Sequence, residues 1–296
     1  IKGKYPDESR IMLLEAWLLL KQGLFEEALE LAERNLQSDK NNAVAWRLMG
    51  EINIKLANYD KAISDLRQSK LLSDDPVIRV SLARAYMNAK RYEDAITELK
   101  NTISDSSTTH EARLLLEYIY KQLERKEALN RFYQDTLEKF PDSTQWLNRA
   151  GSYALRTGQY EKAEQLFQNA CQIKLQENPD LNPKELVKDV TYATAFDGYL
   201  KALLMEAGES GTSIWNPVKV GKVLEECKKY INTSFAPIAY LRMAEANYKL
   251  GNMAKTSEYC KIAIDQTGTN EVLASEVLMR MFLMLGADEV SSYCEQ

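Results

Sequence analysis

Apolar residues recur along most of the chain at spacings of three and four, which is the period of an α-helix that buries one side. The stretch from residue 45 to residue 63 shows this most clearly, because two such segments are separated by a short turn at 56–59. Close variants of the stretch come before and after it. The pattern therefore predicts a series of paired helices built from one repeating element.

A small residue marks the second helix of each predicted pair. These positions are Ala28, Ala62, Ala95, Ala128 and Ala163, with steps of 34, 33, 33 and 35 residues. Two antiparallel helices approach closely only where the facing side chains are small. The regular steps therefore indicate five successive helix pairs over about 9–177.

The rhythm changes after the fifth pair. Two Asn-Pro sequences, at 178–179 and 182–183, precede a long helical pattern over 184–207, and a loop rich in Gly and Ser follows at 208–216. Pro217 then opens a helix that runs to about Tyr230. We expect a sixth, degenerate pair at about 178–236. A seventh pair and terminal helices follow at about 237–296, with a final helix over 271–285.

The repeating element resembles the tetratricopeptide (TPR) repeat. Its Trp, Leu-Gly, aromatic and Ala positions are held in the second pair by Trp46, Met49-Gly50, Tyr59 and Ala62. The fourth pair departs from the pattern, because Leu116 occupies a small-residue position and Arg125 replaces the aromatic residue, so we expect looser packing there. The resemblance implies an all-α, right-handed α-solenoid of about seven TPR-like helix pairs plus a C-terminal helix, as a single superhelical domain over 1–296. Since the sequence begins with Ile rather than Met, we also expect a fragment of a larger TPR protein.

Composition narrows the classes of partner. The net charge of −5 argues against a nucleic-acid surface, which is usually strongly basic. No apolar run approaches the roughly 18–20 residues of a membrane span, so we expect no direct membrane insertion. The four cysteines are widely spaced and form no CxxC pair, which favours buried helix residues over a disulfide framework or a zinc site. The compartment stays open, with the cytoplasm favoured and the periplasm as the alternative.

The sequence carries no recognisable catalytic constellation. GxGxxG, GxxxxGK[ST], HExxH and GxSxG are all absent. His110, the single histidine, follows a Ser/Thr-rich turn and is expected to be solvated or satisfied within the fold. We therefore expect no enzyme activity, no cofactor and no metal.

The TPR resemblance implies that the first helix of each pair lines a concave groove, where a peptide or helix of a partner protein binds. The positions that point away from the second helix are Leu13, Trp17, Leu20, Lys21, Arg47, Glu51, Ile54, Lys55, Arg84, Met87, Asn88, Arg113, Glu117, Tyr120, Lys121, Asn148, Ser152, Leu155, Arg156, Leu241, Glu245, Tyr248 and Lys249.

Within this set we predict partner contacts at Arg47, Glu51, Arg84, Asn88, Arg113, Glu117, Tyr120, Asn148, Ser152 and Arg156. The middle of the groove is locally basic, which favours an acidic or carboxylate-bearing peptide. Asn88 and Asn148 would hydrogen-bond its backbone, and Tyr120 would supply an apolar platform. The alternative is a solvated groove whose charges pair with one another.

Trp215, in the loop after the sixth first helix, is a further predicted contact. It either anchors a partner or folds back over the core. TPR domains that bind chaperone tails use a two-carboxylate clamp motif, and this sequence lacks it. The positions of the first Lys and the two Asn of that motif are occupied by Leu13, Trp17 and Leu48.

We expect a non-catalytic protein-interaction scaffold. The alternatives are the regulatory TPR portion of a larger enzyme, part of a cell-envelope assembly for secretion or polysaccharide export, and self-association through the apolar C-terminal helix.

Overall fold

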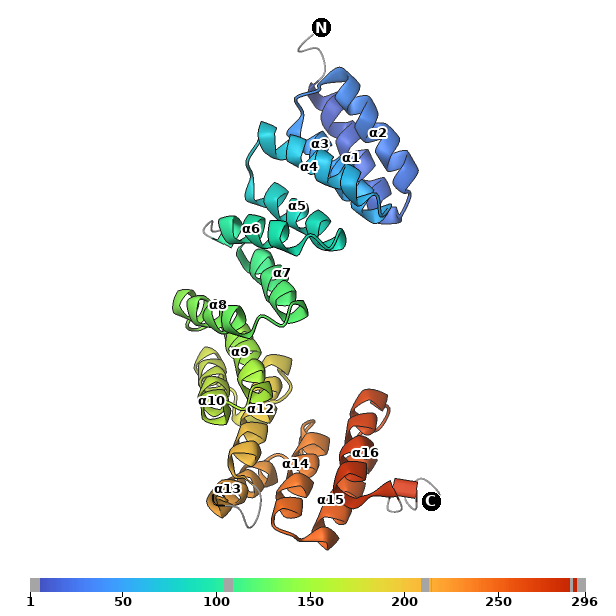
Figure 1. The fold of residues 1–296 in the computed structure, drawn as a ribbon. Coiled ribbons are helices and arrows are strands. Elements are labelled where there is room, and N and C mark those ends of the chain that lie inside the picture. The colour runs from blue at the N-terminus through green and yellow to red at the C-terminus, as the bar shows by residue number, and fades with distance from the viewer. Residues whose placement is uncertain (1–5, 104–108, 209–212, 214, 288–289, 292–296) are drawn as a thin grey trace. The chain divides into compact units, whose positions relative to one another are not determined.

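The computed structural model describes residues 6–103, 109–208, 213, 215–287 and 290–291 of the 296. These residues form sixteen α-helices and no strand (Figure 1). Successive helices pair as antiparallel hairpins, so the predicted all-α solenoid of helix pairs with a C-terminal helix is confirmed. The chain divides into two compact units, unit 1 (residues 1–132) and unit 2 (residues 133–296).

Unit 1 contains the first three pairs and the start of the fourth. Its helices are α1 (Pro6–Gln22), α2 (Phe25–Ser38), α3 (Ala43–Lys55), α4 (Tyr59–Leu72), α5 (Pro76–Asn88), α6 (Tyr92–Ile103), α7 (Thr109–Gln122) and the first part of α8 (Lys126–Lys139).

Unit 2 contains the rest of α8 and the remaining pairs. Its further helices are α9 (Thr144–Arg156), α10 (Tyr160–Glu177), α11 (Pro183–Leu186), α12 (Val190–Glu206), α13 (Pro217–Lys228), α14 (Ala236–Lys249), α15 (Met253–Asp265) and α16 (Glu271–Leu285).

The small residues of the second helices lie where the pairs are closest. Ala28, Ala62, Ala95 and Ala163 are fully buried, as their spacing predicted. Ala128 is only half-buried, in the pair for which the sequence predicted looser packing. Glycines allow still closer approach. A Cβ added at Gly50 would lie 2.4 Å from Cγ of Leu66, so α3 and α4 are in contact there through backbone and side chain.

Phe167 of α10 holds three helices of unit 2 at a fixed spacing. Its ring is buried between Gly151 of α9 and Gly198 of α12. A Cβ at Gly151 would approach the ring to 2.9 Å, and one at Gly198 would approach it to 2.4 Å. Any side chain larger than hydrogen at either position would therefore push these helices apart.

The turn inside most pairs uses one residue in the left-handed region. These residues are Gly23, Ala57, Lys90, Glu124, Gly158 and Gly251, with φ between 52° and 84°. They follow α1, α3, α5, α7, α9 and α14, so the same backbone reversal recurs through both units. Glycine adopts this conformation without steric cost, whereas other residues do so at a penalty.

The sixth pair differs from the continuous helix predicted over 184–207. The chain forms the short α11, which ends at Leu186, and restarts as α12 at Val190. The reason is a strong N-cap: Asp189 Oδ1 accepts hydrogen bonds from the backbone N–H groups of Thr191, at 2.7 Å, and Tyr192, at 3.1 Å. The cap fixes where α12 begins and ends the helical run before it.

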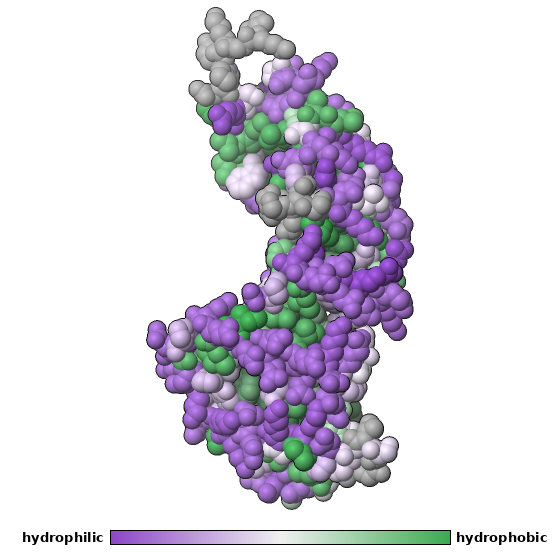
Figure 2. Space-filling view, turned by 90° about the vertical axis from the view of Figure 1, so that its left-hand side faces the viewer, coloured by the Kyte–Doolittle hydropathy of each residue, from purple (hydrophilic) through white to green (hydrophobic). Residues whose placement is uncertain are grey.

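The apolar sides of the helices form the cores of the two units. In unit 2, Phe196 of α12 is the centre of an aromatic cluster, with ring centroids 4.7 Å from Tyr230 and 5.4 Å from Phe235. Cys171, Cys227 and Cys260 are buried, as expected of small helix residues, and Cys294 lies outside the described residues. On the face drawn in Figure 2, apolar residues surface only as patches between larger hydrophilic areas.

Candidate functional site

The first helices of unit 1 enclose a groove, which we call the unit 1 groove. Helices α1, α3 and α5 surround a volume of about 770 Å³. The lining residues are Leu20, Lys21, Gln22, Gly23, Phe25, Glu51, Ile54, Lys55, Ser81, Arg84, Met87 and Asn88. Eight of them belong to the inner set predicted from the sequence, so the structure brings Leu20, Lys21, Glu51, Ile54, Lys55, Arg84, Met87 and Asn88 together.

The charges of this groove are only partly paired. Arg47 Nη1, at its edge, lies 2.7 Å from Glu51 Oε1, and Arg84 forms an ion pair with Glu111 of α7. Lys21 and Lys55 are exposed and have no carboxylate partner among the described residues, although Lys21 Nζ lies 5.1 Å from the ring centroid of Trp17. The groove is therefore basic, with three lining cations against the single carboxylate of Glu51.

Unit 2 has its own hollow on its first helices, which we call the unit 2 groove. Helices α9, α12, α14 and α16 surround about 440 Å³. The lining residues are Ser152, Leu155, Arg156, Lys201, Leu204, Met205, Glu245, Tyr248, Lys249, Arg280, Leu283 and Met284. Ser152 and Arg156, both predicted as partner contacts, are exposed here.

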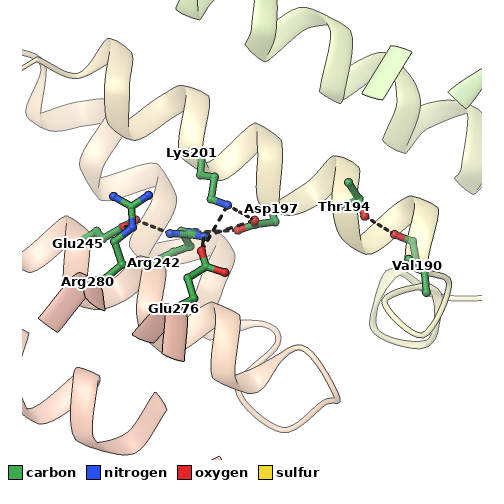
Figure 3. A network of polar contacts seen from close by, with 8 residues as sticks. All are labelled: Val190, Thr194, Asp197, Lys201, Arg242, Glu245, Glu276 and Arg280. Atoms are coloured by element: carbon green, nitrogen blue, oxygen red, sulfur yellow. Dashed lines mark hydrogen bonds and ion pairs between the residues drawn. The ribbon is translucent and has the colours of Figure 1, made fainter. Parts of the chain in front are cut away.

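A buried arginine ties together the helices beside the unit 2 groove (Figure 3). Arg242 of α14 has a side chain only 2% exposed, and its Nε lies 2.7 Å from Oδ1 of Asp197 on α12. Its Nη1 lies 2.7 Å from Glu245 Oε2, and its Nη2 lies 3.4 Å from Glu276 Oε1 on α16. The planar guanidinium thus reaches three carboxylates from three helices.

The network also sets the charge of Asp197. Burial by itself would raise the pKa of this carboxyl, but the charges and hydrogen bonds of Arg242 and Lys201 outweigh it and hold the pKa below its usual value. Lys201 Nζ lies 2.8 Å from Asp197 Oδ2. The carboxylate therefore stays ionised although only 17% of its side chain is exposed.

Four of the predicted contacts do not face an open groove. Arg113, Glu117 and Tyr120 of α7 and Asn148 of α9 are each at most 7% exposed. An α-helix turns by about 100° per residue, so a shift of one residue moves a side chain from an open face to a packed one. Tyr118, next to Glu117, is 51% exposed.

Glu117, Tyr120 and Asn148 each contact other groups of the fold. Glu117 pairs with Lys121 on the same helix, and Asn148 Nδ2 donates a hydrogen bond to the backbone carbonyl of Thr191, at 3.0 Å. The ring of Tyr120 packs edge-on against Phe132, with centroids 6.3 Å apart. The predicted roles of Asn148 in bonding a peptide backbone and of Tyr120 as an open platform are therefore corrected to roles in packing.

Trp215 lies beside the core of unit 2. Its side chain is half-buried and packs against the cluster that contains Phe196 and Leu203. Much of the predicted loop around it, residues 209–212 and 214, lies outside the described residues. The packing fits the reading in which this tryptophan folds back over the core.

Other kinds of site are not evident in the described part of the chain. It holds no group of three or more His, Cys, Asp or Glu side chains placed to bind a metal ion. None of its helices combines the length and apolar character needed to cross a membrane.

Two stretches of the chain match known family models. The model for subunit 3 of the anaphase-promoting complex, or cyclosome, matches residues 4–69, and a tetratricopeptide repeat model matches residues 120–180. A search of curated proteins found no match.

Several solved structures are similar to this chain at low sequence identity. The structure of pilF from Pseudomonas aeruginosa is 12% identical, covers 92% of this chain and 98% of its own, and has a TM-score of 0.51. PilW, described as a type IV pilus biogenesis factor, is 15% identical over 92% of this chain and 99% of its own, with a TM-score of 0.47. YrrB, described as a TPR protein with an unusual peptide-binding site, is 17% identical over 55% of this chain and 84% of its own, with a TM-score of 0.42. At such identities the likeness to pilF concerns the fold alone.

Proposed function

We propose that the chain, parts of which match repeat-protein family models, acts as a non-catalytic scaffold and holds an extended peptide of a partner protein in the unit 1 groove. The observation that carries the proposal is the pair of lysines, Lys21 and Lys55, which face one hollow with no carboxylate partner among the described residues. Charged side chains seldom gather in a concave surface without a counter-charge, since like charges repel. A carboxylate from a partner would supply one.

The rest of the groove suits a peptide backbone. Asn88 and Gln22 are exposed at its wall, and each side-chain amide offers both a donor and an acceptor. An extended peptide has unpaired N–H and C=O groups along its length, which such amides can satisfy. Ile54 and Met87 add apolar surface between the polar groups. The groove therefore combines backbone recognition with a preference for acidic side chains.

Arg84 is expected to contribute less than the lysines. Its guanidinium is about half exposed but already pairs with Glu111, so a partner carboxylate would have to compete for it. Arg47 is similarly engaged by Glu51, which also accepts a hydrogen bond from Ser81 Oγ at 3.0 Å. Arg113 is buried, so reversing its charge would test folding rather than binding.

The proposal is tested with a random 12-residue peptide library selected on the immobilised chain. Selected peptides are then measured by fluorescence anisotropy against the unaltered chain and against Lys21→Glu combined with Lys55→Glu. The reversal should weaken binding at least tenfold, which corresponds to about 1.4 kcal/mol, and selected peptides should be acidic.

Lys40 and Lys100 are exposed outside the groove. The matched control replaces both by Glu, which changes the net charge by the same amount as the groove variant. The control should bind like the unaltered chain. Equal binding by the groove variant, or selection of basic peptides, would overturn the proposal.

A further inference from the structure

We infer that the unit 2 groove is a second binding site, which takes a short acidic segment with large apolar side chains from a partner protein. This inference rests on the proposed function, because it assigns the partner chemistry of a scaffold. The unit 2 groove differs from the unit 1 groove in the apolar surface that it exposes and in the buried network beside it.

The apolar part of the site crosses three helices. Met205 of α12 is 48% exposed, Tyr248 of α14 is 37% exposed and Leu283 of α16 is 63% exposed, and all three line the same hollow. Single exposed apolar residues are ordinary on protein surfaces, but a set that converges on one concave volume is typical of a binding site. These side chains favour a partner that inserts apolar groups of its own.

The charged part of the site is positive. Four lining residues, Arg156, Lys201, Lys249 and Arg280, are cations, and Glu245 is the single lining carboxylate. Adding the network beside the groove brings in Arg242, Asp197 and Glu276. The total among these residues is then five cations against three carboxylates, and Lys249 Nζ is already engaged, since it donates a hydrogen bond to the backbone carbonyl of Gly208 at 2.9 Å.

The network decides which cations are available. Asp197 and Glu245 are held by Arg242, at 2.7 Å each, and by Lys201 and Arg280. Arg156 is exposed, has no carboxylate partner among the described residues, and lies with its Cζ 5.9 Å from the ring centroid of Tyr153. It is therefore the cation best placed to meet a carboxylate of the partner, with a bidentate geometry open to it.

The volume limits the length of the segment. About 440 Å³ lies at the low end of the range for ligand pockets in proteins, roughly 300–1,000 Å³. Such a hollow accommodates a few large side chains and not a whole helix. The expected ligand is a short stretch in which acidic residues alternate with Leu, Met or Phe.

The test uses three fluorescein-labelled 12-residue probes and the full chain. The first alternates Glu with Leu and Phe, the second has every Glu replaced by Lys, and the third has every Leu and Phe replaced by Ser. Anisotropy should show the first binding at least tenfold more tightly than the other two. Raising NaCl from 50 to 500 mM should weaken it, because exposed charges are screened.

Two single variants then locate the site. Arg156→Glu and Leu283→Ser change exposed side chains, so circular dichroism should show an unchanged helix content. Each variant should lower the affinity for the first probe at least fivefold. Lys21→Glu with Lys55→Glu should weaken binding of the first probe less than either unit 2 variant, because the unit 1 groove lacks the exposed apolar set that Met205, Tyr248 and Leu283 supply. Equal binding of all three probes, no binding, or full binding by both unit 2 variants would overturn the inference. Loss of binding only in the unit 1 variant would also overturn it, while supporting the proposed function.

Discussion

Replacing Gly198 by alanine tests the close approach of α12 to α10. The added Cβ would lie 2.4 Å from Cε1 and Cζ of Phe167, whereas non-bonded carbons keep about 3.5–4.0 Å. The ring is 1% exposed and meets the backbone of Gly151 on another side, so it cannot withdraw by the missing ångström. Overpacking costs about 1–3 kcal/mol. Alanine's better helix propensity returns about 1 kcal/mol, and because the overlap is large we expect a net loss of about 2 kcal/mol.

The loss is measured as a shift of the urea midpoint by far-UV circular dichroism, with hydrogen exchange on peptides from each unit. Unit 2 should lose protection and unit 1 should not. Gly221→Ala in α13 is the control, because nothing lies within 4 Å of a Cβ there, so it should stabilise by up to about 1 kcal/mol. Gly198→Ala combined with Phe167→Leu should be less destabilised than the sum of the two. If Gly198→Ala raises the midpoint as Gly221→Ala does, the packing argument is wrong.

Two further predictions concern the buried network of unit 2, and both use the same urea assay. Arg242→Met leaves the carboxylates of Asp197 and Glu245 without their main counter-charge and should lower the free energy of unfolding by about 3–5 kcal/mol. Arg156→Met, at an exposed position, should change it little. Equal effects of the two substitutions would contradict the stabilising role of the network. The pKa of Asp197 is lowered in the folded chain, so its contribution is fully present above pH 3.8 and is lost as the pH falls below that value. Asp197→Asn should therefore be less stable than the unaltered chain at pH 7, with a smaller difference at pH 3; a difference that grows on acidification would refute this sign.

Helix ends were predictable because they depend on local chemistry. Pro217 begins α13, and α16 ends at Leu285, just before Gly286, both as predicted. Each position needs only the stereochemistry of one residue. The break before α12 was missed although Asp189 could have revealed it, because Asp followed by an apolar run is an N-cap signal.

The groove residues were predictable only in part, because a helix in an array has neighbours on several sides. On α5, Arg84 and Asn88, which spacing placed on the open face, are exposed, and their contact with a partner stays a prediction. On α9, Ser152 is exposed, whereas Asn148 is buried beside the half-buried Arg149. Which polar residues stay outside depends on how each helix is rotated against the next one. Spacing within a single helix does not carry that information.

The left-handed turns have a consequence for what determines the hairpins. Ala57, Lys90 and Glu124 adopt the same φ as the glycines at Gly23 and Gly158, although L side chains disfavour it by roughly 1–2 kcal/mol. The reversal is therefore imposed by the two helices that it joins and not by the residue at its apex. Packing between the helices therefore overrides the local backbone preference at these turns. In unit 1, glycine at any of these three positions would remove the steric strain that the side chain causes.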